Sequence, residues 1–269
     1  MTEHTTEQQL TGSASGAHSA YLTRTVQPLV LSLPGKFSHI PMALKQAIKT
    51  TPVIGKAIRS VYLGIRRRRF NSSNDYWKSS YVNGGHSISG TYSKFTRFKA
   101  EVLNKFVRDR GLASVAEFGC GDGNQLRLAE YPSYVGFDIS GSALQICRDT
   151  FADDLTKAFR LVCEGITYPA DLVLSLDVIY HLVEDEAFEA HMTVLFENSK
   201  RYVGIYSSNN DEQEELQPPH VRHRKFSTWI AKHAPDYQLI DHIPNPLPYD
   251  GHADETSFAD FFFYEKKSV

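Results

Sequence analysis

Residues 115–126 read VAEFGCGDGNQL and place an acidic residue, three glycines at alternate positions and an amphipathic run within twelve positions. Glycine lacks a Cβ atom, so such a turn lets the backbone approach a ligand closely. A Walker-type phosphate loop needs Gly-x4-Gly-Lys-Ser/Thr and is excluded, because no Lys, Ser or Thr follows the turn. A dinucleotide fingerprint needs Gly-x-Gly-x-x-Gly, and Asn124 stands where its third glycine belongs. An NAD-type oxidoreductase is therefore disfavoured, and it stays open as an alternative.

Short apolar runs alternate with helical patterns from about Ser114 onward. The runs predict buried parallel strands at 114–118, 134–138, 158–162, 171–176 and 202–207. Helical spacing predicts helices at 142–151, 184–200 and 226–234. Two further strands, 237–243 and 258–266, are joined by a loop too short for a crossover helix, so they should pair antiparallel with the last strand inside the sheet edge. The pattern predicts an α/β fold with helices on both faces of one sheet.

The N-terminal third has a different composition. Residues 1–20 are rich in Thr, Ser, Gly and Gln, and we expect them to be disordered. Between Gln8 and Asn74 there are ten Lys or Arg residues and no Asp or Glu, whereas the chain from Asp75 onward carries 29 acids and 19 bases. Pro52 fits the first position of a helix in which apolar residues recur at helical spacing, namely Ile54, Ile58, Val61, Tyr62 and Ile65. We therefore predict a basic helical arm at 21–75 and a main domain at 76–269.

The bulk composition is that of one enzyme-sized domain with an appendage. The chain has 269 residues, of which 41% are apolar, and no run approaches the roughly 18 apolar residues that span a bilayer. The first residues lack the pattern of a secretory signal. Three cysteines without metal-ligand spacing predict neither a disulfide nor a zinc framework. We expect a cytoplasmic protein, with membrane association through the basic arm as an option.

The glycine turn resembles the nucleoside-binding turn of class I S-adenosylmethionine-dependent methyltransferases, and the resemblance covers most of residues 76–265. It rests on Glu117 before Gly119, Gly121 and Gly123, on Asp138 in VGFDIS, and on the segment DLVLSLDVIYHL. It implies a Rossmann-like, seven-stranded sheet that is mostly parallel with an antiparallel last strand, and S-adenosylmethionine as the cofactor. Asp138, 19 positions beyond Gly119, is the acid that accepts hydrogen bonds from ribose hydroxyls in such folds.

The resemblance also implies which other residues contact the cofactor. We expect the start of the helix after the turn to offer free N–H groups to the carboxylate of the methionine moiety. CEGI (163–166) falls where the adenine edge is lined. The full set of predicted cofactor contacts is Glu117, Gly119, Cys120, Gly121, Gly123, Asn124, Asp138, Ile139, Leu176, Trp77 and Tyr81.

The segment 76–107 is similar to the lead-in of a bacterial methyltransferase subgroup that acts in polysaccharide and secondary-metabolite pathways. In that resemblance Trp77, Tyr81, Gly85, Ser87 and Tyr92 close over the cofactor or acceptor. For any one of these aromatic residues, core packing is the alternative.

The acceptor is predicted from the residues beyond the fourth strand. Nucleic-acid amine methyltransferases carry a Pro-Pro motif there, and SLDVIYHL has no proline, which disfavours a nucleic-acid acceptor. A base helps most when the acceptor is a hydroxyl, and the candidate catalytic residues are Asp177, His181 and His223. The predicted acceptor contacts are Tyr92, Tyr180, His220, Arg222 and Arg224, the last two suited to an anionic group. The sequence thus predicts O-methylation of a small molecule or glycan precursor.

Three alternatives stay open at this stage. Asp177 with Asn209, Asn210 and Asp211 could form a magnesium site, but Asx residues are ordinary in turns and we expect no metal. The basic arm could pack on the domain, close the site, dock a partner or touch an anionic membrane. The domain itself could be a non-catalytic scaffold that binds the cofactor within a glycan or natural-product assembly.

Overall fold

The computed structural model describes residues 52–82, 92–162, 167–215, 217–250 and 256–268. The chain divides into two units, Met1–Gln46 and Ala47–Val269, and the whole first unit lies outside the described residues. The predicted disordered segment 1–20, Gly85, Ser87 and the predicted adenine segment 163–166 also lie outside them.

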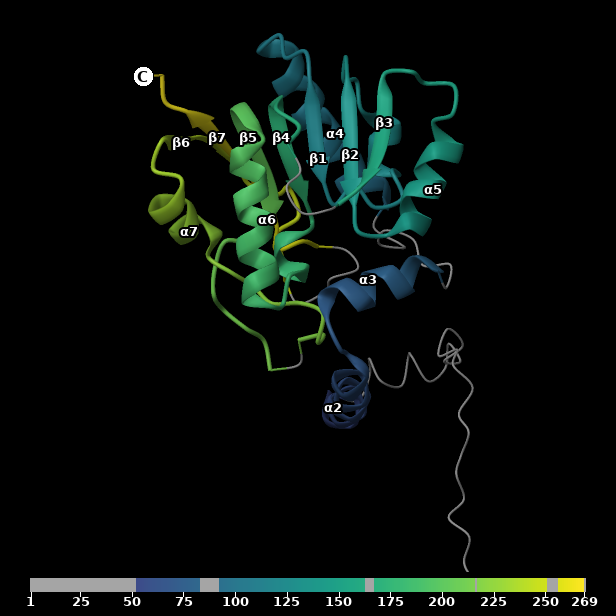
Figure 1. Cartoon of the computed structure of the whole chain (residues 1–269). Coiled ribbons are helices and arrows are strands. Elements are labelled where there is room, and N and C mark those ends of the chain that lie inside the picture. The colour runs from purple at the N-terminus through teal and green to yellow at the C-terminus, as the bar shows by residue number, and fades with distance from the viewer. Residues whose placement is uncertain (1–51, 83–91, 163–166, 216, 251–255, 269) are drawn as a thin grey trace, which may run out of the picture. The chain divides into compact units, whose positions relative to one another are not determined.

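Seven strands form one sheet in the order β3-β2-β1-β4-β5-β7-β6 (Figure 1). Their bounds are β1 Val115–Phe118, β2 Tyr134–Asp138, β3 Lys157–Leu161, β4 Ala170–Leu176, β5 Ser199–Ser207, β6 Tyr237–Ile243 and β7 Asp260–Lys266. Strands β1 to β5 pair in parallel, and β7 lies antiparallel between β5 and β6. The predicted Rossmann-like sheet is confirmed, including the last strand inside the edge.

Helices cover both faces of the sheet, as predicted. Helices α4 (Tyr92–Asp109) and α5 (Gly141–Thr150) pack on one face, and α6 (Asp185–Glu197) and α7 (Phe226–His233) pack on the other (Figure 1). Successive residues of β4 alternate between the two cores, because side chains of a strand point to opposite faces. Leu172 and Leu174 contact the α4 side, and Val173 contacts the α6 side. The central strands are therefore buried on both faces of the sheet, which explains why their sequences are nearly continuously apolar.

Two helices precede the sheet. Helix α2 (Pro52–Arg69) begins at Pro52 as predicted, and α3 (Ser73–Val82) runs through positions 75 and 76, where the domain boundary was predicted. The Ser73 hydroxyl accepts the Val183 N–H at 2.9 Å, and the Ser73 N–H donates to Glu184 at 3.0 Å. Helix α3 is thereby fixed to the segment that leads into α6. Within the described residues, no helix has the length and apolar character required to cross a bilayer.

The largest differences from the predicted boundaries of these elements lie at the end of α6 and the start of β5. The helix expected at 184–200 ends at Glu197, and β5 begins at Ser199 rather than at 202. The reason is Asn198, whose side chain donates to the Val194 carbonyl at 2.9 Å and accepts the Tyr168 N–H. An asparagine side chain competes with the backbone for hydrogen bonds and so ends the helix.

A buried polar pair links α6 to β4. The His191 Nε2 lies 2.8 Å from the Ser175 hydroxyl, and burial lowers the pKa of His191 to about 4. The unfolded chain therefore binds this proton near pH 6.5, well before the folded protein does, so stability falls as the pH falls from about 6.5 toward 4.

We expect His191→Gln to lose about 2 kcal/mol less stability than the parent protein between pH 7 and pH 5. Urea unfolding at the two pH values measures this difference, with the exposed His233→Gln as the matched control. An equal pH dependence in His191→Gln and the parent would contradict the assignment.

Candidate active site

A cavity of about 1230 Å³ lies beyond the carboxyl ends of β1, β2 and β4. Its walls come from α3, α4, the glycine turn, the segment after β4 and the loop before α7. Ligands of doubly wound sheets bind at this edge. The cavity is therefore the candidate active site.

The glycine turn that follows β1 forms one wall. Gly119, Gly121 and Gly123 all have positive φ, of 92°, 57° and 71°. A Cβ atom on Gly119 would lie 2.4 Å from a Val178 methyl group, and one on Gly123 would lie 2.9 Å from the Cys147 sulfur. Both conformation and space thus require glycine at these positions. Gly123 does not line the cavity and instead packs on α5.

The element after the turn differs from the prediction. An α-helix was expected there, and the structure has the 3-10 helix η2 (Gln125–Leu128). Only residues 124–133 connect the turn to β2, which is too short for a helix and a return loop. Two amides of the turn are already bonded, Gly121 N–H to Asp138 at 2.9 Å and Asn124 N–H to Asp122 at 3.2 Å. The expected row of free helical N–H groups is therefore absent from this described segment.

Two buried carboxyl groups border the turn, as predicted. Asp138 accepts the N–H groups of Gly121 and Ser140, at 2.9 and 2.8 Å, and burial raises its pKa. Glu117 accepts a hydrogen bond from the Tyr134 hydroxyl at 2.7 Å, and burial raises its pKa to about 7. Both line the cavity. Each carboxyl group would gain from a ligand that brings donors or positive charge.

Asp177 lies at the end of β4 in an unusual conformation. It has a φ of 59°, which only a few per cent of residues other than glycine adopt. Its carboxylate is held from two sides, by the Lys99 ammonium at 2.6 Å and by the Tyr180 hydroxyl at 2.8 Å. Such strain persists only where the surroundings enforce it.

Lys99 is a site residue that sequence reasoning missed. It comes from α4, lines the cavity and is buried with Asp177, their side chains being 11% and 17% exposed. The available signal was its spacing, because Lys99 falls four residues after Phe95 and four before Leu103, on the apolar side of the helix.

Four histidines line the cavity, namely His181, His191, His220 and His223, and burial lowers the pKa of each. His181 has a pKa of about 4, and its Nδ1 lies 3.0 Å from the His220 carbonyl oxygen. A carbonyl only accepts, so Nδ1 carries the proton and Nε2 keeps its lone pair. His220 has a pKa of about 3, and the Nδ1 of His223 lies 2.7 Å from the Ser208 hydroxyl. His181 is therefore a neutral imidazole whose second nitrogen accepts protons.

Aromatic rings surround these histidines. Tyr76 stacks on His220 at 4.3 Å between centroids, and Trp77 meets His181 edge-on at 4.6 Å. Phe258 contacts Tyr180 at 4.8 Å and His223 at 4.6 Å. All of these rings line the cavity. The wall around the histidines is thus aromatic.

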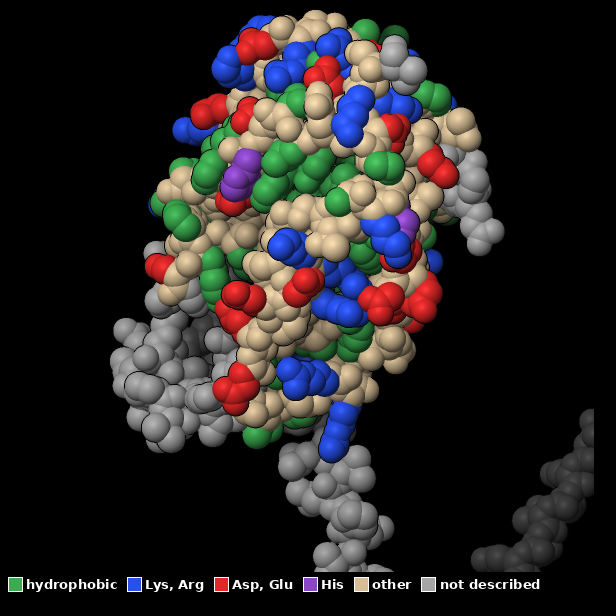
Figure 2. Space-filling view, turned by 90° about the vertical axis from the view of Figure 1, so that its left-hand side faces the viewer, with side chains coloured by type: hydrophobic (Ala, Val, Ile, Leu, Met, Phe, Trp, Pro, Cys, Tyr) green, Lys and Arg blue, Asp and Glu red, His purple; other side chains and the backbone are tan. Residues whose placement is uncertain are grey.

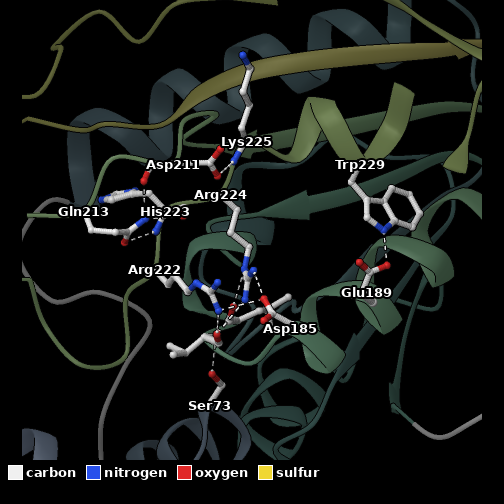
Figure 3. Close-up of polar contacts among 12 residues, drawn as sticks. Ser73, Asp185, Glu189, Asp211, Gln213, Arg222, His223, Arg224, Lys225 and Trp229 are labelled. Atoms are coloured by element: carbon white, nitrogen blue, oxygen red, sulfur yellow. Dashed lines mark hydrogen bonds and ion pairs between the residues drawn. The ribbon is translucent and has the colours of Figure 1, made fainter. Parts of the chain in front are cut away.

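Arg222 and Arg224, which were predicted to hold an anionic acceptor, do not line the cavity. Arg224 donates to the Leu182 and Val183 carbonyls at 3.1 and 2.8 Å and pairs with Asp185 at 2.6 Å (Figure 3). Arg222 donates to the Val183 carbonyl at 2.9 Å. The two guanidinium groups join the loop before α7 to the start of α6 and so hold the segment that carries His181.

The remaining predicted residues fall as follows. Cavity-lining positions that were predicted as cofactor or acceptor contacts are Trp77, Tyr81, Cys120, Asn124, Ile139, Leu176, Tyr180 and His220. Tyr92 begins α4, but its side chain lies outside the described ones. The neighbouring Cys147 thiol and burial hold the pKa of Cys120 well above its usual range, so this thiol is no nucleophile.

The possible magnesium ligands are engaged elsewhere. Asn209 accepts the Ser227 N–H at 3.1 Å, and Asp211 accepts the Lys225 N–H at 2.9 Å. Among the residues that the structure describes, no group of three or more His, Cys, Asp or Glu side chains could hold a metal ion.

Comparison with known proteins supports the fold. No family model matches the chain, and no curated protein matches it by sequence. N-methyltransferase NodS from Bradyrhizobium japonicum WM9, in complex with S-adenosyl-l-homocysteine, aligns over 74% of this chain and 100% of its own, with 12% identity and a TM-score of 0.56. Magnesium protoporphyrin IX methyltransferase (ChlM) from Synechocystis PCC 6803, with bound SAH, aligns over 76% of this chain and 99% of its own, with 16% identity and a TM-score of 0.52.

The chain therefore has the fold of class I S-adenosylmethionine-dependent methyltransferases, which confirms the predicted resemblance at the level of the fold. At these levels of sequence identity, the structural similarity establishes the fold. The reaction has to be argued from the residues of the site.

Proposed function

We propose that the protein transfers a methyl group from S-adenosylmethionine to a hydroxyl group of a neutral small molecule or glycan precursor. The observation that carries this proposal is the cavity itself, in which a glycine turn with buried carboxyl groups faces a neutral histidine within an aromatic wall. The cofactor supplies an activated methyl group, so the protein's task is to align the acceptor and remove its proton.

The charge of the cavity supports this cofactor. Four acids at the strand ends and in the glycine turn line the cavity, namely Glu117, Asp122, Asp138 and Asp177, and Lys99 beside them is already paired with Asp177. A sulfonium with an ammonium group and ribose hydroxyls suits such a wall. A dinucleotide needs a helix N-terminus for its pyrophosphate, and the described chain has only the four-residue η2 after the turn. The NAD alternative is thus disfavoured by shape and by charge.

His181 is the base that we assign for the acceptor hydroxyl. Its Nδ1 proton is committed to the His220 carbonyl, which fixes the ring and the tautomer. Its Nε2 is unprotonated, and so available as a base, at any pH above about 4, because the pKa of His181 is lowered to that value. Asp177 is held by Lys99 and Tyr180 and therefore suits positioning better than proton transfer.

The aromatic wall favours a neutral acceptor. Tyr76, Trp77 and Phe258 offer ring faces and edges, on which sugar rings and phenols pack well. Arg222 and Arg224, the cations that were predicted to bind an anionic acceptor, instead bond to the chain itself.

Isothermal titration with S-adenosylhomocysteine and with NADH tests the cofactor assignment. We expect binding of the first and none of the second. Transfer of a labelled methyl group is then screened over neutral oligosaccharides, phenols and, as the anionic class, sugar nucleotides. Binding of NADH alone would overturn the cofactor assignment, transfer only to sugar nucleotides would overturn the neutral acceptor, and cofactor binding without any transfer would favour the scaffold alternative.

Asp138→Ala should weaken binding of S-adenosylhomocysteine about 5- to 150-fold, because the ribose hydroxyls lose an acceptor that is worth about 1 to 3 kcal/mol. The matched control is Asp171→Ala. Asp171 also accepts two backbone N–H groups, from Ala113 and Ser114 at 2.9 and 3.0 Å, but does not line the cavity. Equal dissociation constants for Asp138→Ala and the parent protein would refute the ribose contact.

A further inference from the structure

We propose that α2 binds the surface of a membrane that contains anionic lipids, lying flat on it through Val61, Ile65, Arg68 and Arg69. This inference goes beyond methyl transfer and stands on the two faces of α2. The helix carries six Lys or Arg residues and no acid over its 18 positions.

One face of α2 is committed to the protein. Leu63 is buried, with 6% of its surface exposed. The Arg66 guanidinium donates to the Tyr76 hydroxyl at 3.3 Å, and Arg67 donates to the Glu215 carbonyl at 3.5 Å. These contacts settle which side of the helix faces the domain.

The opposite face carries apolar side chains in solvent. Val61 and Ile65, one turn apart, are 65% and 49% exposed. At about 100° per residue these two positions lie opposite Leu63. In the sequence the same spacing continues backward through Ile58 and Ile54. Val61 and Ile65 are thus turned away from the protein.

Arginines flank that stripe. Arg68 and Arg69 are exposed, and at about 100° per residue one lies on each side of the line through Val61 and Ile65. Apolar residues that enter the acyl boundary, with long cations beside them at the level of the headgroups, define an interfacial helix. The face of the protein in Figure 2 differs, since its acidic and basic side chains are interspersed.

A bilayer suits this face better than a folded acidic protein does. The stripe is convex and offers no pocket for a partner's side chains, whereas a lipid surface deforms around it. Arg66 joins α2 to Tyr76, which lines the cavity, so a bound α2 would hold the cavity beside the membrane.

Flotation of the full chain with vesicles tests the proposal. The vesicles are phosphatidylcholine alone and phosphatidylcholine mixed with phosphatidylglycerol. We expect binding to the anionic vesicles only, weakened about 25-fold in Arg68→Gln/Arg69→Gln, at about fivefold per arginine. Val61→Ser/Ile65→Ser should weaken it about tenfold or more, because the apolar contact is lost.

Matched controls carry the same changes elsewhere on the surface. Leu155→Ser/Leu239→Ser removes two leucines that are 97% and 50% exposed, and Lys94→Gln/Lys232→Gln removes two exposed lysines. Both should bind anionic vesicles within about twofold of the parent protein. Absence of vesicle binding, or equal losses in the α2 variants and their controls, would overturn the proposal. If α2 instead docks on a protein or on residues 1–46, vesicle binding should be absent.

Discussion

Lys99→Met is expected to lower the free energy of unfolding by about 3 kcal/mol, the typical cost of leaving one charge of a buried pair without its partner. The Lys99 ammonium lies 2.6 Å from Asp177, and both side chains are less than one-fifth exposed. The variant keeps the apolar stem of the side chain, so the loss reports the charge rather than the packing. Urea unfolding at pH 7 measures it.

The same helix provides the control. Lys105 pairs with Asp109 on the surface of α4, with 70% and 43% of their side chains exposed, and Lys105→Met should cost less than about 0.5 kcal/mol. Asp177→Asn in the Lys99→Met background should recover part of the loss, because an amide needs no cation. If Lys99→Met proves no more destabilising than Lys105→Met, the pair has no structural role.

His181→Asn is expected to lower kcat about 100-fold or more and to leave the affinity for S-adenosylhomocysteine within about twofold. The asparagine amide can replace Nδ1 as the donor to the His220 carbonyl, so the loop keeps its hydrogen bond while the basic nitrogen is lost. Steady-state rates with the acceptor found in the methyl-transfer screen provide the measurement.

The pH profile separates a base from a structural residue. The base acts when deprotonated, and the pKa of His181 is lowered to about 4, so this group should reduce the rate of the parent protein only as the pH falls toward 4. His181→Asn should lose that acid limb. His223→Asn is the matched variant, with an expected loss below about tenfold. A larger loss in His223→Asn than in His181→Asn would transfer the role of base to His223.

The sheet and the turn were predictable because their determinants are local in the sequence. Buried parallel strands need apolar residues on both faces, and DLVLSL carries leucine at every second position with Val173 on the opposite face. The spacing of Gly119, Gly121 and Gly123 follows from positive φ at each position and from Val178 and Cys147 beside two of them. The antiparallel last pair followed from a loop that is too short for a crossover.

The partners of charged side chains were not predictable, because they depend on segments that are distant in the sequence. Arg222 and Arg224 were predicted to contact the acceptor, yet they bond to Val183 and Asp185, about 40 positions away. Lys99 was not among the predicted site residues, yet its ion pair with Asp177, 78 positions away, holds it at the cavity.

By itself the sequence determined the class I methyltransferase sheet, the glycine turn and the acids beside it, since strand periodicity and backbone conformation are properties of neighbouring residues. Only the tertiary structure decided which cations face the cavity, which nitrogen of His181 is free and which side of α2 faces outward. Those outcomes depend on which groups lie within hydrogen-bond distance once the chain is packed, and a hydrogen bond extends only about 3 Å.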